Sequence, residues 1–450
     1  MKTRVVKFTD IHSTLRFDGS YHNAEVNVYD NVIKQHSSNV LSYYCSDIFT
    51  SGRNKRVYTS EEFGVPFLSN SDIVSANPFM SCKYSSKKYG YDESAVLRGG
   101  MILTGRVGAI GQTAFVPSYI EKAKAMGSDN IIRIVVKPQF RNGFLYAYLA
   151  SKIGNLSFWK HATGGVQPFI TDAMVGKLPI PDFPEEFQKE VDDLIQESAR
   201  LREEAADALK EAVNYFNEKY PIKENIQKTF TLGLKDLKLG FAAYNNNLEV
   251  DDFIKEYSNN AYELKSRTSK IFAPPLFKHI YLSKDNGYPF MTGSELTQFN
   301  LRYYRWLSPR GVKDINDYVV KRGTLLLYKS GTTDGGILGN VFIADKKLDG
   351  CCLSDHVIRI VFNEERQAYW AFAFLRSKGG VRMLQRLATG TMIPFITPER
   401  LSHIIIPNPD DNYERIIALI EKYINLNSMS KDNENRAINL VESEIGKWNG

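Results

Sequence analysis

The chain has 450 residues, of which 43% are hydrophobic, 12% aromatic and 24% charged, with a net charge of +6. This length predicts about two to four domains, and this composition is typical of a globular protein that buries real cores. No apolar run reaches the roughly 18 residues of a membrane span, and no apolar signal segment opens the chain, so we expect a cytoplasmic protein. Four cysteines without CxxC spacing predict reduced core thiols rather than a metal or redox site.

The first feature along the chain that suits a binding role is a basic cluster, Arg53-Asn54-Lys55-Arg56, followed by Tyr58. Such side chains fit phosphates and guanine edges, although a solvated loop remains an alternative. A second basic group follows at Lys83, Lys87 and Lys88. The glycine-rich run that holds Arg106 lacks both dinucleotide and phosphate-loop spacing, so we interpret it as a turn between strands.

The rest of the first half alternates between strand and helix patterns. We predict a strand over residues 131–136, a helix over 144–152, and a helix that opens at Thr171-Asp172. Arg133 lies inside the apolar strand, which favours a structural arginine, and Lys160 precedes an Ala-Thr-Gly loop. This mixture predicts an α+β domain.

A long helix should follow, because residues 185–219 contain neither proline nor glycine. Its apolar and small residues recur every three or four positions on one stripe, as in a coiled coil. The stripe consists of Phe187, Val191, Leu194, Ser198, Leu201, Ala205, Ala208, Ala212 and Tyr215. The helix could pack on its own domain alone, but pairing with a second long helix explains its length better.

The second half of the chain repeats the first. Residues 128–181 align with residues 354–407 at a constant offset of 226, with 20 of 54 positions identical. Upstream the offset is 223, and it pairs Tyr58 with Tyr281. This period is far longer than that of a solenoid, so it indicates a duplicated domain.

The repeat places counterparts of the first-half features in the second half. We predict a strand over 357–362, a helix over 368–377 and a helix start at Thr397-Pro398. The basic cluster corresponds to Leu276-Phe277-Lys278-His279, in which only the lysine persists. The remaining candidates for DNA contact are Arg302, Arg305, Arg310, Lys329 and Arg386, the last of which matches Lys160.

A second long helix should begin near Tyr413 and continue through Ile417, Ile420 and Ile424. The polar stretch over residues 425–435 predicts a bent or frayed middle. We therefore divide the chain into a first repeated domain at 1–183, a long helix at 184–220, a second repeated domain at 221–409 and a C-terminal long helix at 410–450. If the halves are related by an approximate twofold axis, the two helices run antiparallel.

Charge is distributed unevenly over these parts. Residues 184–219 carry 11 acidic and 5 basic side chains, and residues 410–450 carry 8 and 5, which leaves 47 basic against 32 acidic in the two repeated domains. Basic domains joined by acidic helices suit a protein that binds a polyanion. The histidines lack metal-ligand spacing, and we find no nucleophile elbow, HExxH motif or carboxylate pair, so we expect no catalytic residues and no metal or cofactor in this chain.

In its order of motifs the whole chain closely resembles the specificity subunit of type I restriction–modification systems. The motifs are a Gly-x-Pro-Phe strand before Ser71-Asp72-Ile73 or Ser294-Glu295-Leu296, the stretches that begin at Gly100 and Gly323, the Ala-Thr-Gly…Pro-Phe-Ile-Thr segments, and a helix that opens with Pro184-Glu185-Glu186-Phe187-Gln188. No single motif is specific, but their repeated order is. One departure is Glu414, which stands where the first helix has Gln188.

The resemblance implies that two recognition domains each read one half of a split DNA site. It also implies that the helices set the gap and dock two modification subunits, which bind S-adenosylmethionine and methylate adenine. Restriction subunits would add translocation and cleavage driven by ATP and Mg²⁺, and the specificity subunit would have no active site of its own. The docking candidates are Phe187, Gln188, Val191, Leu194, Leu201, Ala205, Ile417, Ile420 and Ile424.

Because the basic loops differ between the halves, we expect two different half-sites and an asymmetric whole site. Two alternatives remain open: a recognition subunit of another restriction–modification class, and a tandem protein that binds a ligand other than nucleic acid, such as a glycan.

Overall fold

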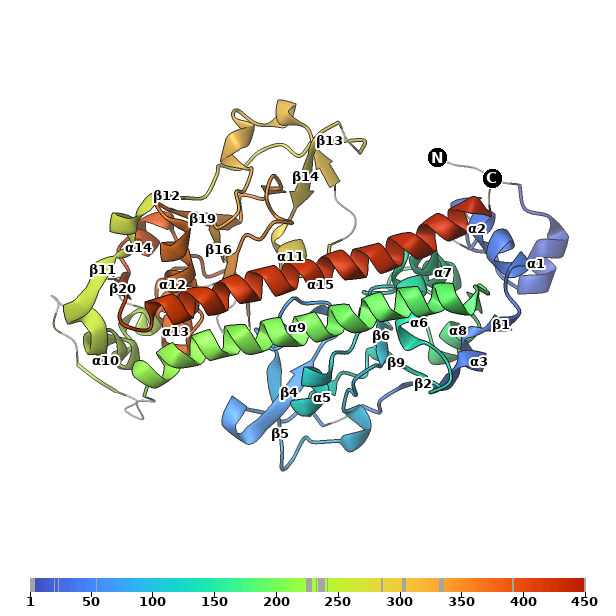
Figure 1. Cartoon of the computed structure of the whole chain (residues 1–450), viewed down its shortest axis with the longest axis horizontal. Helices are drawn as coiled ribbons and strands as arrows, with labels where there is room; N and C mark the ends of the chain where they lie inside the picture. Colours follow the sequence, from blue (N-terminus) through green and yellow to red (C-terminus); the bar gives the residue numbers. More distant parts are fainter. Residues whose placement is uncertain are drawn as a thin grey trace. The chain divides into compact units, whose positions relative to one another are not determined.

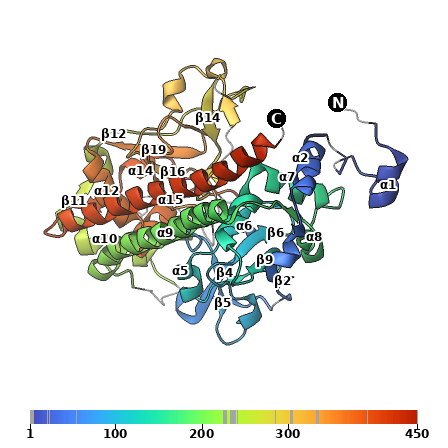
Figure 2. The same ribbon diagram turned by 45° about the vertical axis from the view of Figure 1, so that its right-hand side comes forward.

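A computed structural model of the whole chain describes residues 5–19, 21–22, 24–53, 55–223, 229–231, 233, 239–240, 242–284, 286–301, 305–331, 336–390 and 392–448. The chain folds into two compact units. Unit 1 comprises Met1–Glu203 and Met429–Gly450, and unit 2 comprises Glu204–Ser428. Figures 1 and 2 show both units with their helices and strands.

Unit 1 is built on two four-stranded sheets. The larger has the antiparallel strand order β2-β9-β6-β7, and the second has the order β3-β5-β4-β8, in which β4 and β8 are parallel. A short pair, β1 with β10, adds to them. The strands are β1 (Asn39–Val40), β2 (Cys45–Thr50), β3 (Tyr58–Thr59), β4 (Gly64–Leu68), β5 (Lys83–Ser86), β6 (Ile102–Gly105), β7 (Thr113–Phe115), β8 (Met126–Gly127), β9 (Ile131–Val136) and β10 (Pro179–Ile180).

Helices cover the larger sheet of unit 1. The main core joins apolar residues of β6 and β9 to the largely buried helix α6 and to α7. Helix α2 lies against α7, as Figure 2 shows. The helices of this unit are α1 (Phe8–Thr14), α2 (Ala24–Gln35), α3 (Leu41–Tyr44), α4 (Asn70–Ile73), α5 (Ser118–Lys122), α6 (Asn142–Ala150), α7 (Lys152–His161) and α8 (Asp172–Gly176).

Unit 2 repeats this topology strand by strand. Its sheets have the orders β12-β19-β16-β17 and β13-β15-β14-β18, with β11 paired to β20. The strands are β11 (Ala261–Glu263), β12 (Thr268–Phe272), β13 (Tyr281–Leu282), β14 (Tyr288–Met291), β15 (Arg305–Leu307), β16 (Leu325–Tyr328), β17 (Val341–Ile343), β18 (Cys352–Leu353), β19 (Val357–Phe362) and β20 (Ile405–Pro407). The helices are α10 (Leu248–Tyr257), α11 (Gly293–Leu296), α12 (Glu365–Leu375), α13 (Lys378–Arg386) and α14 (Pro398–Ser402). The repeat in the sequence is therefore a repeat of the fold, and the predicted α+β class is confirmed.

Two helices of 35 residues each, α9 (Glu185–Lys219) and α15 (Tyr413–Lys447), contribute to both units. They run antiparallel in each. In unit 1 the Ser198 hydroxyl donates to the Ser430 carbonyl over 2.8 Å, and in unit 2 Arg415 pairs with Glu211 over 2.7 Å. The views in Figures 1 and 2 agree in drawing them side by side. The predicted pairing of the helices is thus confirmed within each unit.

The middle of α15 corrects one expectation. The polar stretch over residues 425–435 predicted a bend or fraying, but α15 is continuous from Tyr413 to Lys447. Ser430 is fully buried and Glu434 is 9% exposed, because these polar side chains face a neighbour rather than solvent. Ser430 is small enough to allow close approach of α9, so its polarity does not interrupt the helix.

Each core is completed by both long helices. In unit 1, Val191 and Ile195 of α9 join Ile438 and Val441 of α15 in the main core. In unit 2, the C-terminal part of α9 and the N-terminal part of α15 contribute in the same way. The first N–H of α7 is capped by Glu442 of α15 over 2.7 Å, and the equivalent N–H of α13 is capped by Asn217 of α9 over 2.8 Å.

Local predictions hold at several points. Thr171 and Thr397 cap α8 and α14 through their side chains. All four cysteines are buried and free. Arg133 and Arg359 are buried, and each donates to four backbone carbonyls, which makes them structural. Among the described residues, no helix is long and apolar enough to cross a membrane.

Candidate nucleic-acid interface

The basic loop of unit 1 lies between β2 and β3. Arg53, Lys55 and Arg56 are exposed, and Asn54 falls outside the described residues. Asp129 lies 2.9 Å from the Arg56 guanidinium and 3.7 Å from that of Arg53. One carboxylate therefore holds two arginines close together at the surface, and it neutralises only part of their charge.

A cation stacked on a tyrosine occurs at equivalent places in the smaller sheets. Lys83 of β5 lies 4.8 Å from the ring centre of Tyr58 on β3. Arg305 of β15 lies 5.5 Å from the ring centre of Tyr281 on β13. Arg305 also pairs with Glu295 over 2.7 Å. Exposed cation–aromatic pairs of this kind offer both charge and a stacking surface to a nucleic acid.

Glu295 illustrates how these cations are held. Burial alone would raise the pKa of Glu295, but hydrogen bonds from Thr292 and the charge of Arg305 outweigh it and keep that pKa below its usual value. The carboxylate therefore stays charged and fixes Arg305 on the sheet.

The remaining surface candidates lie on loops and turns around the smaller sheets. Arg302 is outside the described residues. The others are exposed, and they are Lys87, Lys88, Lys278, His279 and Arg310. Lys87 donates to the Glu62 carbonyl over 3.2 Å. The His279 ring lies 4.5 Å from that of Phe277 between ring centres.

A third repeated cation follows the central strand of each larger sheet. Arg106 follows β6 and Lys329 follows β16, and both are half-buried. Beside each lies a loop closed by reciprocal backbone hydrogen bonds of 2.8 Å, between Thr163 and Phe169 in unit 1 and between Thr389 and Phe395 in unit 2. Gly164 and Gly390 take φ values of 99° and 93° in these loops, which favour glycine.

The tips of these two loops expose apolar side chains. Val166 is fully exposed in the first, and Met392 and Ile393 are 92% and 68% exposed in the second. Exposed apolar residues therefore occur at the same place in both repeated loops, next to a cation.

The family assignment follows from the second half of the chain. Residues 268–440 match the model of the type I restriction modification DNA specificity domain. The second half of the chain is thus similar to this family of DNA specificity domains. Unit 1 lies outside the matched residues apart from the end of α15, and it repeats the strand order of unit 2.

Comparison with solved structures gives matches of low similarity. The HsdS subunit from Thermoanaerobacter tengcongensis is 16% identical, with a TM-score of 0.29, over 91% of this chain and 95% of that one. The type I S subunit from M. genitalium is 10% identical, with a TM-score of 0.27, over 91% of each chain. The type IIG endonuclease BpuSI matches 42% of this chain and 30% of its own, at 10% identity and a TM-score of 0.30. No curated protein matches the chain.

Two basic candidates prove to be internal to the units. Lys160 is 4% exposed and pairs with Asp30 over 2.5 Å. Its counterpart Arg386 has a side chain that is 12% exposed and pairs with Asp251 over 2.6 Å. Both ion pairs tie a helix of the domain to its neighbour and occupy these charges internally, so a contact of the two residues with DNA stays a prediction that the structure does not favour.

The pKa of Asp30 reflects this arrangement. Burial alone would raise it, but hydrogen bonds and charge from Lys160 and Lys34 outweigh burial and hold it below its usual value.

Most docking candidates on the long helices are also covered. Phe187 and Leu194 are half-buried, and Gln188 donates to the Phe183 carbonyl over 2.7 Å. The remaining six are buried in the units' own cores and helix pairs: Val191, Leu201, Ala205, Ile417, Ile420 and Ile424. These six side chains hold the chain together and cannot form a docking surface as they stand.

Reasoning from the sequence missed three polar residues of this interface. Asn130 and Gln167 line a pocket beside Arg106, and His356 occupies the position in unit 2 that Asn130 has in unit 1. Their place in the repeat could have revealed them. At these positions the two halves carry different residues, although nearby residues match.

Proposed function

We propose that each unit reads one half of a bipartite, asymmetric DNA sequence. The observation that carries this proposal is a single topology used twice with different exposed residues. The buried frame repeats, as Arg133 and Arg359 do, whereas the exposed Arg53 is replaced by the exposed Leu276. Two readers with the same frame and different contact groups suit two different half-sites.

The distribution of charge supports DNA as the ligand. The residues outside the two long-helix segments carry the excess of basic side chains, and the exposed candidates lie on the smaller sheets and adjoining loops. Cations of this kind bind phosphates, and aromatic partners such as Tyr58 and Tyr281 add stacking surfaces. A glycan-binding protein has no need of this excess.

We further propose that α9 and α15 set the number of unspecified base pairs between the half-sites. Their antiparallel pairing supports this role, because a paired helix resists bending better than a single one. Modification subunits would dock on exposed surface of these helices and adjoining loops, not on the buried stripe. The chain itself would supply recognition and no catalysis, and S-adenosylmethionine, ATP and Mg²⁺ would act in the partner subunits.

The spacer proposal is tested by lengthening both helices together. Seven residues, about two turns, inserted near Ala205 in α9 and near Lys422 in α15 add ~10.5 Å of helix. The unspecified gap should then grow by about three base pairs at ~3.4 Å each. The matched control carries the insertion in α9 alone, which should shift the pairing with α15 and lower the stability. An unchanged gap in a stable double-insertion protein contradicts the proposal.

DNA binding itself is tested on the complex with its methyltransferase partners. Affinity measured from low to high salt should fall linearly on a log–log plot, because phosphate contacts release counterions. Binding that is insensitive to salt would favour a ligand other than nucleic acid.

A further inference from the structure

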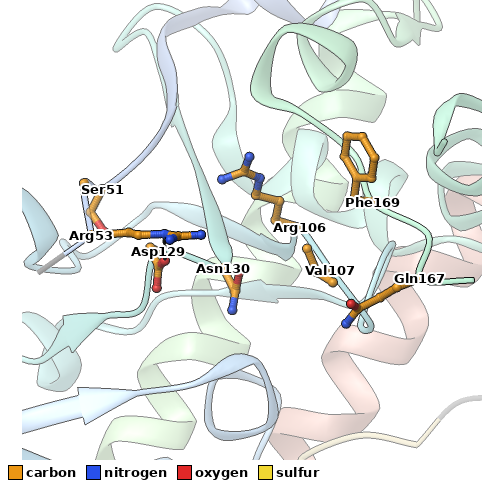
Figure 3. Close-up of a pocket in the computed structure, with 9 residues that line it drawn as sticks. Ser51, Arg53, Arg106, Val107, Asp129, Asn130, Gln167 and Phe169 are labelled. Carbon is orange, nitrogen blue, oxygen red and sulfur yellow. Dashed lines mark ion pairs between the residues drawn. The ribbon is translucent and has the colours of Figure 1, made fainter. Parts of the chain in front are cut away.

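A pocket of about 440 Å³ opens in unit 1 beside the Thr163–Phe169 loop. Its lining includes Arg53, Arg106, Asn130, Gln167 and Phe169. Figure 3 shows Arg53 entering from the side of β2, and Gln167 and Phe169 from the loop. Asp129 also lines the pocket, 3.7 Å from the Arg53 guanidinium. The pocket therefore combines two cations, one carboxylate that pairs with Arg53, two amides and one aromatic ring, which leaves the charge of Arg106 and the amides to contact phosphate and base edges.

Arg106 occupies a position that the backbone fixes. Its N–H donates to the Asn130 carbonyl over 2.8 Å, and its carbonyl accepts from the Ile170 N–H over 2.9 Å. In unit 2, the Lys329 N–H donates to the His356 carbonyl over 2.8 Å, and its carbonyl accepts from the Ile396 N–H over 2.7 Å. The two cations thus stand at the same point of the same turn.

Within the described part of the chain, neither cation has an ion-pair or hydrogen-bond partner for its side chain. This differs from Arg56 and Arg53, which share Asp129, and from Lys160 and Arg386, which are paired internally. A charged side chain held at a fixed point without a partner is ready for an external anion.

Asp129 and Phe169 of the lining are repeated as Asp355 and Phe395, but two other lining positions differ between the units. Gln167 corresponds to Ile393, and Arg53 corresponds to Leu276. A group present in both units cannot distinguish two half-sites, whereas a group present in only one can. An amide can form paired hydrogen bonds to an adenine edge, and an isoleucine side chain cannot.

Resting on the proposed function, we infer that Arg106 and Lys329 are equivalent contacts to DNA phosphate that do not depend on sequence, and that Gln167 contacts a base edge in the first half-site only. The repeat itself supplies the variants that separate these roles. Unit 2 carries lysine where unit 1 has Arg106, and isoleucine where unit 1 has Gln167.

The phosphate role is tested on the complex with its methyltransferase partners, using a duplex with the methylated motif and a scrambled duplex. Arg106→Ala should weaken binding by the same factor on both duplexes and reduce the salt slope by about 0.9, the value for one phosphate contact. Lys329→Ala should weaken binding and reduce the salt slope in the same way. Arg106→Lys should give the salt slope of the unmodified complex. Lys255→Ala, which removes an exposed charge from α10, is the matched control and should leave the slope unchanged.

The base-edge role is tested by sequencing the methylated sites. Gln167→Ile should relax or change one position of one half-site, and it should leave the other half-site and the affinity for scrambled DNA unchanged. Arg106→Ala should leave the motif as it is. The inference is overturned if Arg106→Ala alters the motif, if its salt slope equals that of the unmodified complex, or if Gln167→Ile leaves every position unchanged. Failure of the unmodified complex to bind DNA in a salt-dependent way would instead overturn the proposed function.

Discussion

Ser198 of α9 and Ser430 of α15 form a reciprocal contact in unit 1. Each hydroxyl donates to the backbone carbonyl of the other residue, over 2.8 Å and 2.7 Å, and the two hydroxyl oxygens lie 2.9 Å apart. Both side chains are buried, at 4% and 0% exposure. Small residues on both sides let the two helix backbones approach closely here.

This contact predicts a size limit at Ser198. Ser198→Leu should destabilise the protein by about 1–3 kcal/mol, because extra methylene groups cannot fit without moving a helix. Ser198→Ala, the matched control, removes hydrogen bonds but keeps the small size, and should cost about 1 kcal/mol. Urea unfolding followed by circular dichroism at 222 nm measures both. A leucine variant as stable as the unmodified protein would contradict the close approach.

Lys160 should act on stability and not on DNA contact. Lys160→Ala leaves Asp30 buried without its main partner, which should cost about 3–5 kcal/mol. The double variant Lys160→Met with Asp30→Leu should recover much of that loss, because no charge is then left buried. At a temperature where the double variant is folded, its DNA affinity and salt slope should equal those of the unmodified complex. A smaller salt slope in the double variant would indicate that Lys160 contacts DNA.

Asp30 should also make unit 1 sensitive to acid. Since its pKa is lower in the folded chain than the ordinary value of 3.8, its stabilising effect is full above that value and disappears as the pH falls below it. Thermal unfolding measured from pH 6 to pH 3 should show a decline that is shallower in Asp30→Asn, which has no such charge to lose. If stability declined equally with pH in the two proteins, Asp30 would not be a cause of the sensitivity to acid.

The shared helices predict that two matched substitutions on α15 act on different units. Ile438 belongs to the core of unit 1 and Ile420 to that of unit 2, and both are fully buried. Either change to alanine should cost about 2–5 kcal/mol. Hydrogen exchange should rise first over residues 1–203 in Ile438→Ala and over residues 204–428 in Ile420→Ala. The same exchange pattern in both variants would contradict this division of the cores.

Much of the frame was predictable because it depends on local signals. The span 185–219 lacks helix breakers, and it forms one helix over those residues. Thr171 and Thr397 cap helices as their residue types predict. The repeat also predicted that Arg133 and Arg359 share a structural role, since both lie in apolar strands.

What failed depends on contacts between distant segments. The charge of Lys160 looked available until Asp30, 130 residues earlier, was seen to neutralise it. The polar middle of α15 led to a prediction of fraying, because the sequence around Ser430 does not reveal its contact with Ser198, which lies 232 residues away. The pocket beside Arg106 brings together Arg53 and Gln167 from separate segments, which no local pattern could indicate.

The central claim is that two similarly built units read two different half-sites. The most direct measurement is the methylated motif in the genome of a host that expresses this chain with its methyltransferase partners. The account predicts a motif in two parts that differ in sequence and are separated by a fixed number of unspecified base pairs. A continuous motif, or a palindrome with identical halves, would contradict it.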